Sequence, residues 1–255
     1  MKKFNIKFDR LLYVLAIIVM GLCAVRCGNP GTPTGGPRDR KPPVMITSTP
    51  AINSTGFSGS IVTIEFDENI QVKDATNMFV VSPPLPKQPK VEGHANVINV
   101  RMDSDTILAP GTTYTFDFAD CVSDLNEGNT LDDFTFTFST GESTDSMMIS
   151  GNLFDASNIT PLAGIYVILQ SNLADTAFRT VAPIRIAKTD TEGRFQIKNV
   201  PAERNYRIYA LDDKNRNFLF DQPGEMIAWL ADTVRPSWEI RHINDSCLLY
   251  TSDAA

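Results

Sequence analysis

The residues best suited to chemistry lie close together near the C-terminal end of the chain, within residues 212–225. Their side chains carry oxygen atoms at nearly every second position. The donors are Asp213, Asn215, Asn217, Asp221 and Glu225, with the backbone carbonyl of Leu219 between them. A loop with alternating oxygen ligands can wrap around a hard cation. The spacing therefore predicts a calcium-binding loop.

A second interpretation of the same stretch needs no ion. Phe218 stands where such a loop usually has a glycine, and Glu225 falls one residue later than an EF-hand loop would place it. Lys214 and Arg216 add positive charge. Asp and Asn are also frequent in turns because their side chains accept hydrogen bonds from the neighbouring backbone. We therefore favour an Asx-rich turn beside the terminal strands, with a calcium site as the alternative.

Catalytic arrangements are not evident elsewhere in the sequence. Adjacent acidic pairs occur at residues 67–68 and 132–133, but neighbouring side chains of a strand point to opposite faces and would not act on one sugar. His94 and His242 are far apart, and neither has a Cys, His or acidic neighbour at metal-ligand spacing. The sequence contains no Gly-x-Ser-x-Gly, no phosphate-binding glycine loop and no zinc-binding His pair. We therefore expect that the protein is not an enzyme.

Two tryptophans near the end of the chain allow two interpretations. Trp229 and Trp238 flank a short mixed segment. An exposed aromatic ring on a β-sandwich can stack on a sugar, whereas a buried one belongs to the core. Because no aromatic platform surrounds them in the sequence, we expect both to be core residues, with glycan binding as the alternative.

The N-terminus has the pattern of an export signal. Basic residues precede residues 11–24, a run without charge that is shorter than the roughly 20 residues of a membrane-spanning helix. Cys27 follows, and its thiol could receive the acyl chains of a bacterial lipoprotein. Arg26 departs from the small residue usual before such a cysteine, and Cys23 is the alternative site. We predict that residues 1–26 are a signal peptide and that Cys27 carries the lipid, palmitate included.

The segment after this cysteine reads as a spacer. Residues 28–43 contain four glycines and five prolines, which is typical of an extended, solvated tether. From Cys27 onward the chain has 18 basic and 29 acidic residues, a net charge of −11 that disfavours nucleic acid as a partner. We expect an outer-membrane lipoprotein of the cell envelope that contacts the membrane through its anchor. The lack of an acidic run after Cys27 favours the periplasmic face over the surface.

Short runs with alternating or β-branched residues, broken by Gly, Pro, Asn and Asp, predict an all-β fold. In residues 134–138 aromatic residues alternate with threonines, which indicates a strand that buries one side. The expected strands are residues 60–66, 79–82, 95–101, 112–118 and 133–139, then 148–153, 165–170, 185–189, 194–197 and 206–211. Their spacing favours two β-sandwiches in series.

The first block, residues 44–141, resembles the bacterial Ig-like domain of surface-layer proteins and surface lipoproteins. The matching segments are residues 42–43, 48–50, 64–70, 108–116, 124–129 and 136–141. Residues 27–39, Cys-Gly-Asn-Pro-Gly-Thr-Pro-Thr-Gly-Gly-Pro-Arg-Asp, are similar to the opening of Bacteroidota-type lipoproteins that carry this domain. The resemblance implies an Ig-like sandwich. It also implies that residues 124–129, which have three oxygen donors in a tight turn, form a structural connection loop.

A polar linker, residues 142–146, leads to a second block that we place at residues 147–246. Residues 161–169, 189–202 and 206–211 are similar to carboxypeptidase-regulatory-like and collagen-adhesin B-type domains. The resemblance implies a transthyretin-like sandwich. Gly164 and Gly193 lie between expected strands, where a tight turn needs a residue with positive φ.

The last nine residues, 247–255, follow abruptly and resemble a translated sequencing adapter. We therefore expect that the natural chain continues past Ser246 and that Cys247 forms no disulfide with Cys121. The whole pattern predicts a non-catalytic structural, display or adhesive module of the cell envelope. The alternatives are a glycan-binding component of the outer membrane, with a protein or glycan ligand, and the accessory domains of an enzyme whose catalytic part lies beyond the C-terminus.

Overall fold

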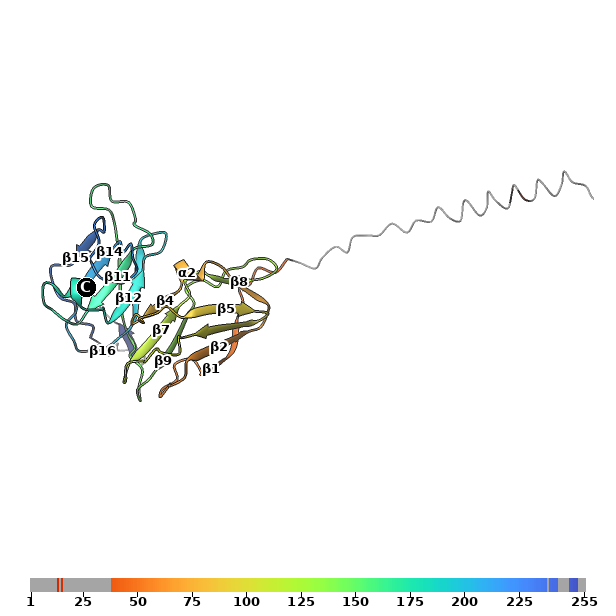
Figure 1. Ribbon diagram of the computed structural model, residues 1–255, viewed down its shortest axis with the longest axis horizontal. Helices are drawn as coiled ribbons and strands as arrows, with labels where there is room; N and C mark the ends of the chain where they lie inside the picture. Colours follow the sequence, from red (N-terminus) through yellow and green to blue (C-terminus); the bar gives the residue numbers. More distant parts are fainter. Residues whose placement is uncertain (1–12, 14, 16–37, 238, 243–247, 252–255) are drawn as a thin grey trace, which may run out of the picture. The chain divides into compact units, whose positions relative to one another are not determined.

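The computed structural model describes residues 13, 15, 38–237, 239–242 and 248–251 (Figure 1). Residues 40–255 form one compact unit that contains the strands. Two four-residue helices, α2 (Ala75–Met78) and α3 (Ala177–Thr180), interrupt them. The all-β prediction is confirmed. Among the described residues no helix has the length and apolar character to cross a membrane.

The first sandwich comprises β1 to β9. Its largest sheet has the order β1-β2-β6-β5, and a second sheet has the order β4-β7-β9, while β3 pairs with β8. All of these pairings are antiparallel. The strands are β1 (Met45–Thr49), β2 (Ile61–Phe66), β3 (Ile70–Val72), β4 (Val80–Ser82), β5 (Lys90–His94), β6 (Val97–Arg101), β7 (Thr113–Asp117), β8 (Val122–Asp124) and β9 (Thr135–Ser139).

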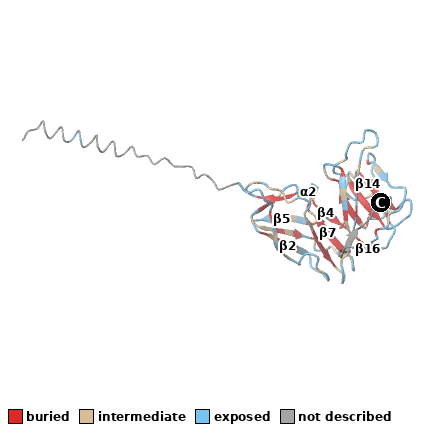
Figure 2. Ribbon diagram, turned by 180° about the vertical axis from the view of Figure 1, so that it is seen from behind, coloured by how far each residue is buried: buried red, intermediate tan, exposed pale blue. Residues whose placement is uncertain are grey.

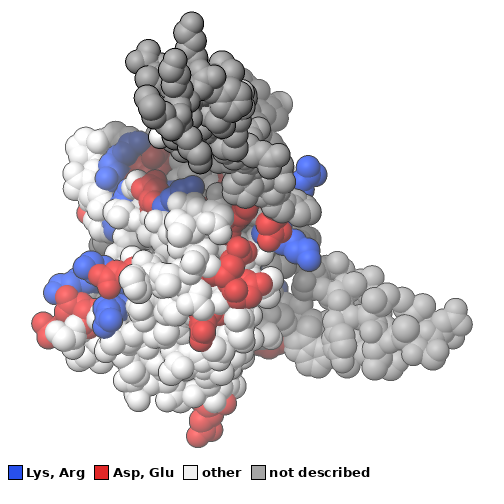
Figure 3. Space-filling view, turned by 90° about the vertical axis from the view of Figure 1, so that its right-hand side faces the viewer, with Lys and Arg blue, Asp and Glu red and all other residues white. Residues whose placement is uncertain are grey.

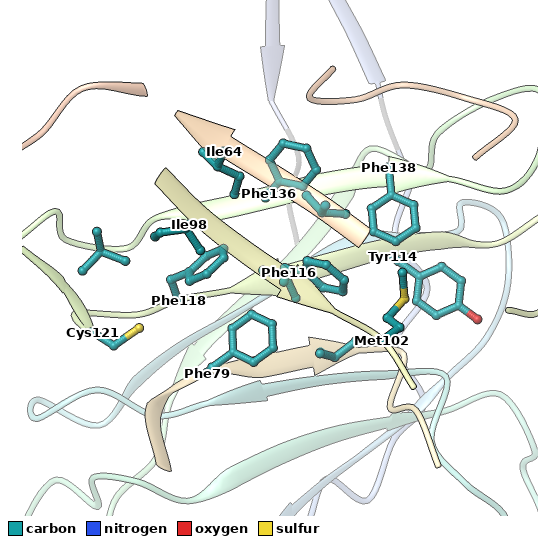
Figure 4. Close-up of a cluster of buried hydrophobic side chains, with 14 of the residues drawn as sticks. Ile64, Phe79, Ile98, Met102, Tyr114, Phe116, Phe118, Cys121, Phe136 and Phe138 are labelled. Atoms are coloured by element: carbon teal, nitrogen blue, oxygen red, sulfur yellow. The ribbon is translucent and has the colours of Figure 1, made fainter. Parts of the chain in front are cut away.

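Aromatic residues fill the space between these sheets. Phe138 on β9 contacts the rings of Phe57, Tyr114 and Phe116, at centroid distances of 4.6, 5.6 and 5.2 Å. Figure 4 shows Tyr114, Phe116 and Phe138 gathered with Ile64 and Ile98 of the facing sheet. The predicted aromatic face of β9 is confirmed, because burial of alternate large side chains is what fixes a strand in a sandwich.

The second sandwich comprises β10 to β15. Its sheets have the orders β12-β11-β14-β15 and β10-β13, again antiparallel. In a separate two-stranded sheet β16 (Glu239–His242) pairs antiparallel with β17 (Leu248–Thr251). The other strands are β10 (Met147–Asn152), β11 (Tyr166–Gln170), β12 (Arg185–Lys188), β13 (Arg194–Val200), β14 (Arg207–Leu211) and β15 (Ile227–Trp229).

The core of the second sandwich is smaller. Ile149, Val167, Leu169, Ile197 and Tyr206 are buried in it, and buried strands of both sandwiches appear red in Figure 2. Tyr206 is fully buried, and its hydroxyl donates to the carbonyl of Pro201 over 2.7 Å. Because the hydroxyl of Tyr206 has a hydrogen-bond partner, burial of the ring holds the start of β14 without leaving a polar group unpaired.

The predicted strands lie within a few residues of the observed ones. The predicted positive φ at the two turn glycines is confirmed. Gly164 and Gly193 have φ of 75° and 74°. A Cβ at position 193 would lie 2.5 Å from the carbonyl oxygen of Leu153, so this turn admits only glycine. The short strands β3, β8 and β15 and the edge strands β1 and β5 were not predicted.

Candidate functional site

The predicted calcium loop is a closed turn in which Asp213 organises the backbone. Its Oδ1 accepts hydrogen bonds from the amides of Asn215 and Arg216, at 3.1 and 2.7 Å, and its Oδ2 accepts one from the amide of Phe218 at 2.7 Å. Phe218 has φ of 61°. The residue that replaces the expected glycine therefore adopts the left-handed conformation that a glycine would.

The other predicted ligands meet in the same turn. The amide groups of Asn215 and Asn217 donate to the two carboxylate oxygens of Asp221, at 3.0 and 2.7 Å. Glu225 is buried, and it accepts hydrogen bonds from the backbone amides of residues 214, 221 and 222. The structure thus brings all five residues together, with their oxygens bound to the loop itself. Among the described residues no three His, Cys, Asp or Glu side chains are grouped to hold a metal ion, and calcium binding stays a prediction.

The loop also reaches the first sandwich. Arg216 donates to the carbonyl of Thr76, at 2.9 Å, and to the side-chain oxygen of Asn77, both in α2. Lys188 on β12 donates to the carbonyl of Asn77 at 2.8 Å. We use the term junction for the contacts between the two sandwiches, of which these form one end.

The centre of the junction is apolar. Val80 on β4 of the first sandwich is buried in a cluster with four residues of the second, Tyr166, Ile168, Ile186 and Tyr209. Beside it the amide of Ile186 donates to the hydroxyl of Ser82 over 3.0 Å. Strand β4 therefore packs on the outer face of the β12-β11-β14 sheet, and its removal would expose apolar surface on both sides.

Threonines of the first sandwich accept hydrogen bonds in the same interface. The side-chain amide of Asn199 on β13 donates to Thr115 on β7 and Thr137 on β9, at 2.6 and 3.0 Å. Both threonines are buried. The prediction that the strand at residues 134–138 buries one side is therefore wrong, because the second sandwich covers its threonine face.

A buried cation completes the junction. Arg185 is 3% exposed, and its guanidinium donates to the carboxylate of Asp145, at 2.9 Å, and to the carbonyl of Asn199, at 2.6 Å. Asp145 is also bound to the first sandwich, because its backbone amide donates to the hydroxyl of Thr113 over 2.8 Å. The expected linker residue is thus bound to both sandwiches.

A polar cleft of about 560 Å³ opens beside the junction. Its walls come from the end of β7, the following loops, and the outer face of the β10–β13 sheet. The lining residues are Asp117, Asp133, Ser150, Gly151, Asn152, Lys188, Asp190, Arg194, Phe195, Gln196 and Lys198. Burial, and then repulsion from Asp133 and Asp120, raises the pKa of Asp117 above its ordinary value, although the amide of Ala119 donates to it.

An apolar cavity of about 340 Å³ adjoins the cleft and shares Ser150, Gly151, Asn152 and Phe195 with it. Ile149, Ile208, Trp229 and Leu230 contribute to its wall. Trp229 is 65% exposed, so the expectation that it is a core residue is wrong. The physical reason is that β15 is the edge strand of its sheet. Trp238 lies outside the described residues.

Residues 124–129 form a structural turn. Asp124 is fully buried, and its carboxylate accepts hydrogen bonds from the amides of Glu127, Gly128 and Asn129, at 2.6, 3.0 and 2.6 Å. Burial opposes ionisation, but these amides outweigh it and hold the pKa of Asp124 below its ordinary value. The carboxylate oxygens are thus engaged in the connection loop that the resemblance implied.

The remaining sequence predictions fall in different places. Cys121 is buried as a free thiol, and burial raises its pKa to about 12. Of the adjacent acidic pairs, Asp67 accepts a hydrogen bond from the amide of Val44 over 2.7 Å, and Asp133 lines the cleft beside the junction. Cys23, Cys27, the tether up to residue 37 and the expected signal peptide apart from residues 13 and 15 lie outside the described residues. The expected adapter tail contributes β17.

Comparison with known proteins identifies the first block. Residues 39–140 match the family model of the bacterial Ig-like domain, which confirms that part of the resemblance. No curated protein matches the chain in sequence.

Three solved structures show a distant likeness. The T6 backbone pilin of serotype M6 Streptococcus pyogenes is 12% identical, with 78% of this chain and 53% of the pilin covered and a TM-score of 0.21. For the S-layer protein rSbsC the values are 16%, 75%, 26% and 0.24. For BcpA, the major pilin subunit of Bacillus cereus, they are 9%, 74%, 66% and 0.21. The chain therefore spans about half of the first pilin and about a quarter of the S-layer protein.

Proposed function

We propose that this chain is a non-catalytic module of the bacterial cell envelope that holds two β-sandwiches as one stiff body, for display or adhesion. The observation that carries the proposal is the junction. It joins an apolar centre around Val80 to buried polar contacts at Arg185 and Asn199. A linker between independently moving domains would leave such groups solvated, whereas here their burial opposes separation.

The membrane attachment is part of the same proposal. The Ig-like match and the lipoprotein-like opening of the sequence support a lipid anchor at Cys27, followed by the tether. On this view the second sandwich is of the carboxypeptidase-regulatory-like type, and the module stands in the outer membrane on its periplasmic face. A stiff pair of domains on a solvated tether would hold whatever it carries clear of the lipid headgroups.

Distance measurements between spin labels test the stiffness. Ile107 and Ile159 are 90% and 77% exposed on different sandwiches, so labelled Ile107→Cys and Ile159→Cys should leave the fold intact. Cys23, Cys27 and Cys247 would be serine in this background. We expect one narrow distance distribution that broadens in an Arg185→Met, Asn199→Ala double variant.

The matched control is Arg194→Ala, which removes exposed ion pairs of β13 without touching the junction. It should leave the distribution narrow. A broad distribution in the parent chain would contradict the proposal, and so would a double variant as narrow as its parent. Recovery of the full reading frame tests the third alternative, because a catalytic domain encoded past Ser246 would make this an accessory region.

A further inference from the structure

The polar cleft beside the junction has the dimensions and position of a ligand site. Ligand pockets commonly occupy about 300–1,000 Å³ and occur at domain interfaces, and this cleft of about 560 Å³ lies between the end of β7 and the outer face of the β10–β13 sheet. The junction contacts at Asn199 and Arg185 hold its two walls in place. The cleft is therefore formed before any ligand arrives, which reduces the entropic cost of binding.

The charges that line the cleft cancel. It has three acidic residues, Asp117, Asp133 and Asp190, and three basic ones, Lys188, Arg194 and Lys198. Two of the basic groups are already engaged, because Arg194 lies 2.8 Å from the carboxylate of Asp190 and Lys188 donates to α2. An anionic ligand would meet the carboxylates and a cationic one the amines, so the balance favours an uncharged ligand.

Uncharged polar side chains also line the cleft. Ser150, Asn152 and Gln196 are exposed on the cleft face of the β10–β13 sheet, and their side chains form no hydrogen bond to another described residue. The ring of Phe195 covers Gly151 on the opposite face of these strands, where it packs against the second core, and a Cβ at Gly151 would lie only 2.8 Å from it. The ring thus rests on backbone that carries no side chain, and its position is fixed by that contact.

We infer that this cleft binds a short, uncharged oligosaccharide. Sugar hydroxyls both donate and accept hydrogen bonds, which suits a wall of mixed carboxylates, amides and amines. The apolar face of a pyranose ring can lie on the methylene groups of Arg194 and Lys198. A peptide of the same size would need apolar pockets for its side chains, whereas Phe195, the large apolar residue among those that line the cleft, packs against the second core. The inference goes beyond the structural role proposed above and does not depend on it.

Calorimetric titration of the full chain in detergent tests the inference with defined probes. Cellohexaose, mannohexaose and xylohexaose serve as uncharged ligands, and hexagalacturonate and a chitosan hexamer as charged ones. We expect at least one neutral hexasaccharide to bind and both charged ones to bind more weakly. Asn152→Ala and Gln196→Ala should each weaken binding about tenfold, as expected for a lost hydrogen bond.

Two further variants separate the cleft from other surfaces. Gln196→Trp should abolish binding by filling the cleft from an exposed position that does not line the apolar cavity. Gln222→Ala, at an exposed position in residues 212–225, is the matched control and should bind as the parent does. Failure of all three neutral probes overturns the inference. So does preferential binding of a charged probe, or binding that survives Gln196→Trp and is lost in Trp229→Ala. The spin-label distances report stiffness separately, so either proposal can fail alone.

Discussion

At the scale of single residues, acidic side chains in this protein mostly organise backbone. Asp124 and Asp213 each accept hydrogen bonds from three backbone amides of a following turn. A carboxylate that closes a turn in this way needs no ion to be useful. The same oxygens are nevertheless the ligands a calcium ion would take, which is why a sequence pattern alone could not separate the two interpretations.

Asp124 should make stability depend on pH. Its pKa is lowered in the folded protein, so its contribution is fully present above the unfolded value of about 3.9 and is lost as the pH falls through the folded pKa. We expect Asp124→Asn to reduce the free energy of unfolding by about 2 kcal/mol at pH 7. Urea denaturation at pH 7 and pH 3 measures this. An equal loss at both pH values would contradict the assigned role of the charge.

The turn at residues 212–225 provides a direct test of calcium. If the side-chain oxygens of this turn give up their hydrogen bonds from amides and bind calcium instead, a calcium concentration 100 times the Kd should stabilise the fold by about 2.7 kcal/mol. Thermal unfolding with calcium and with EGTA measures this, and Asp221→Ala should remove the difference. Identical melting curves in calcium and EGTA would contradict calcium binding and show that these residues serve to form the Asx-rich turn.

At the scale of elements, β9 shows how one strand serves two interfaces. Its phenylalanines fill the first core, and Thr137 meets Asn199 of the second sandwich. The alternation of Phe and Thr made the strand and its apolar face predictable. The burial of the threonine face was not predictable, because it depends on a partner surface far away in the sequence.

The same reasoning explains which strands were missed. Central strands such as β2, β7 and β11 carry buried β-branched or aromatic residues, and the pattern of these residues predicts the strands. The edge strand β1 has exposed residues at Ile46 and Thr47, so its apolar alternation is weak. The cleft had no signal in the sequence, because its lining residues are spread from Asp117 to Lys198 and only the fold brings them together.

Removal of a central aromatic residue should be costly. Phe138 is fully buried and contacts three other rings. We expect Phe138→Ala to reduce the free energy of unfolding by about 3–5 kcal/mol, from lost burial and a residual cavity. Guanidinium denaturation gives the value. Ile107→Ala, at a position 90% exposed, is the control and should change it by less than about 0.5 kcal/mol.

At the scale of the whole molecule, charge and attachment act together. On the face shown in Figure 3, basic side chains lie beside acidic ones and form no continuous patch. The described residues of this face have no cluster of basic groups that could neutralise phosphates, in line with the net charge of −11 from Cys27 onward. Retention at a membrane then rests on the proposed lipid.

Metabolic labelling with an alkyne-tagged palmitate tests that attachment. We expect the label on the parent chain, expressed in a bacterium with lipoprotein processing, and its loss in Cys27→Ser. The Cys23→Ser variant should be labelled like the parent, since the site is assigned to Cys27. Label lost in Cys23→Ser and retained in Cys27→Ser would move the anchor to the alternative cysteine.

The buried Cys121 also gives the molecule an internal reporter of opening. A thiol whose pKa is about 12 yields almost no reactive thiolate at neutral pH, and burial keeps reagents away. In a chain whose other cysteines are serine, alkylation of Cys121 must therefore wait for the first sandwich to open. Its labelling rate across a urea series measures the free energy of that opening, and in an oxidising compartment the same barrier sets how long the thiol survives.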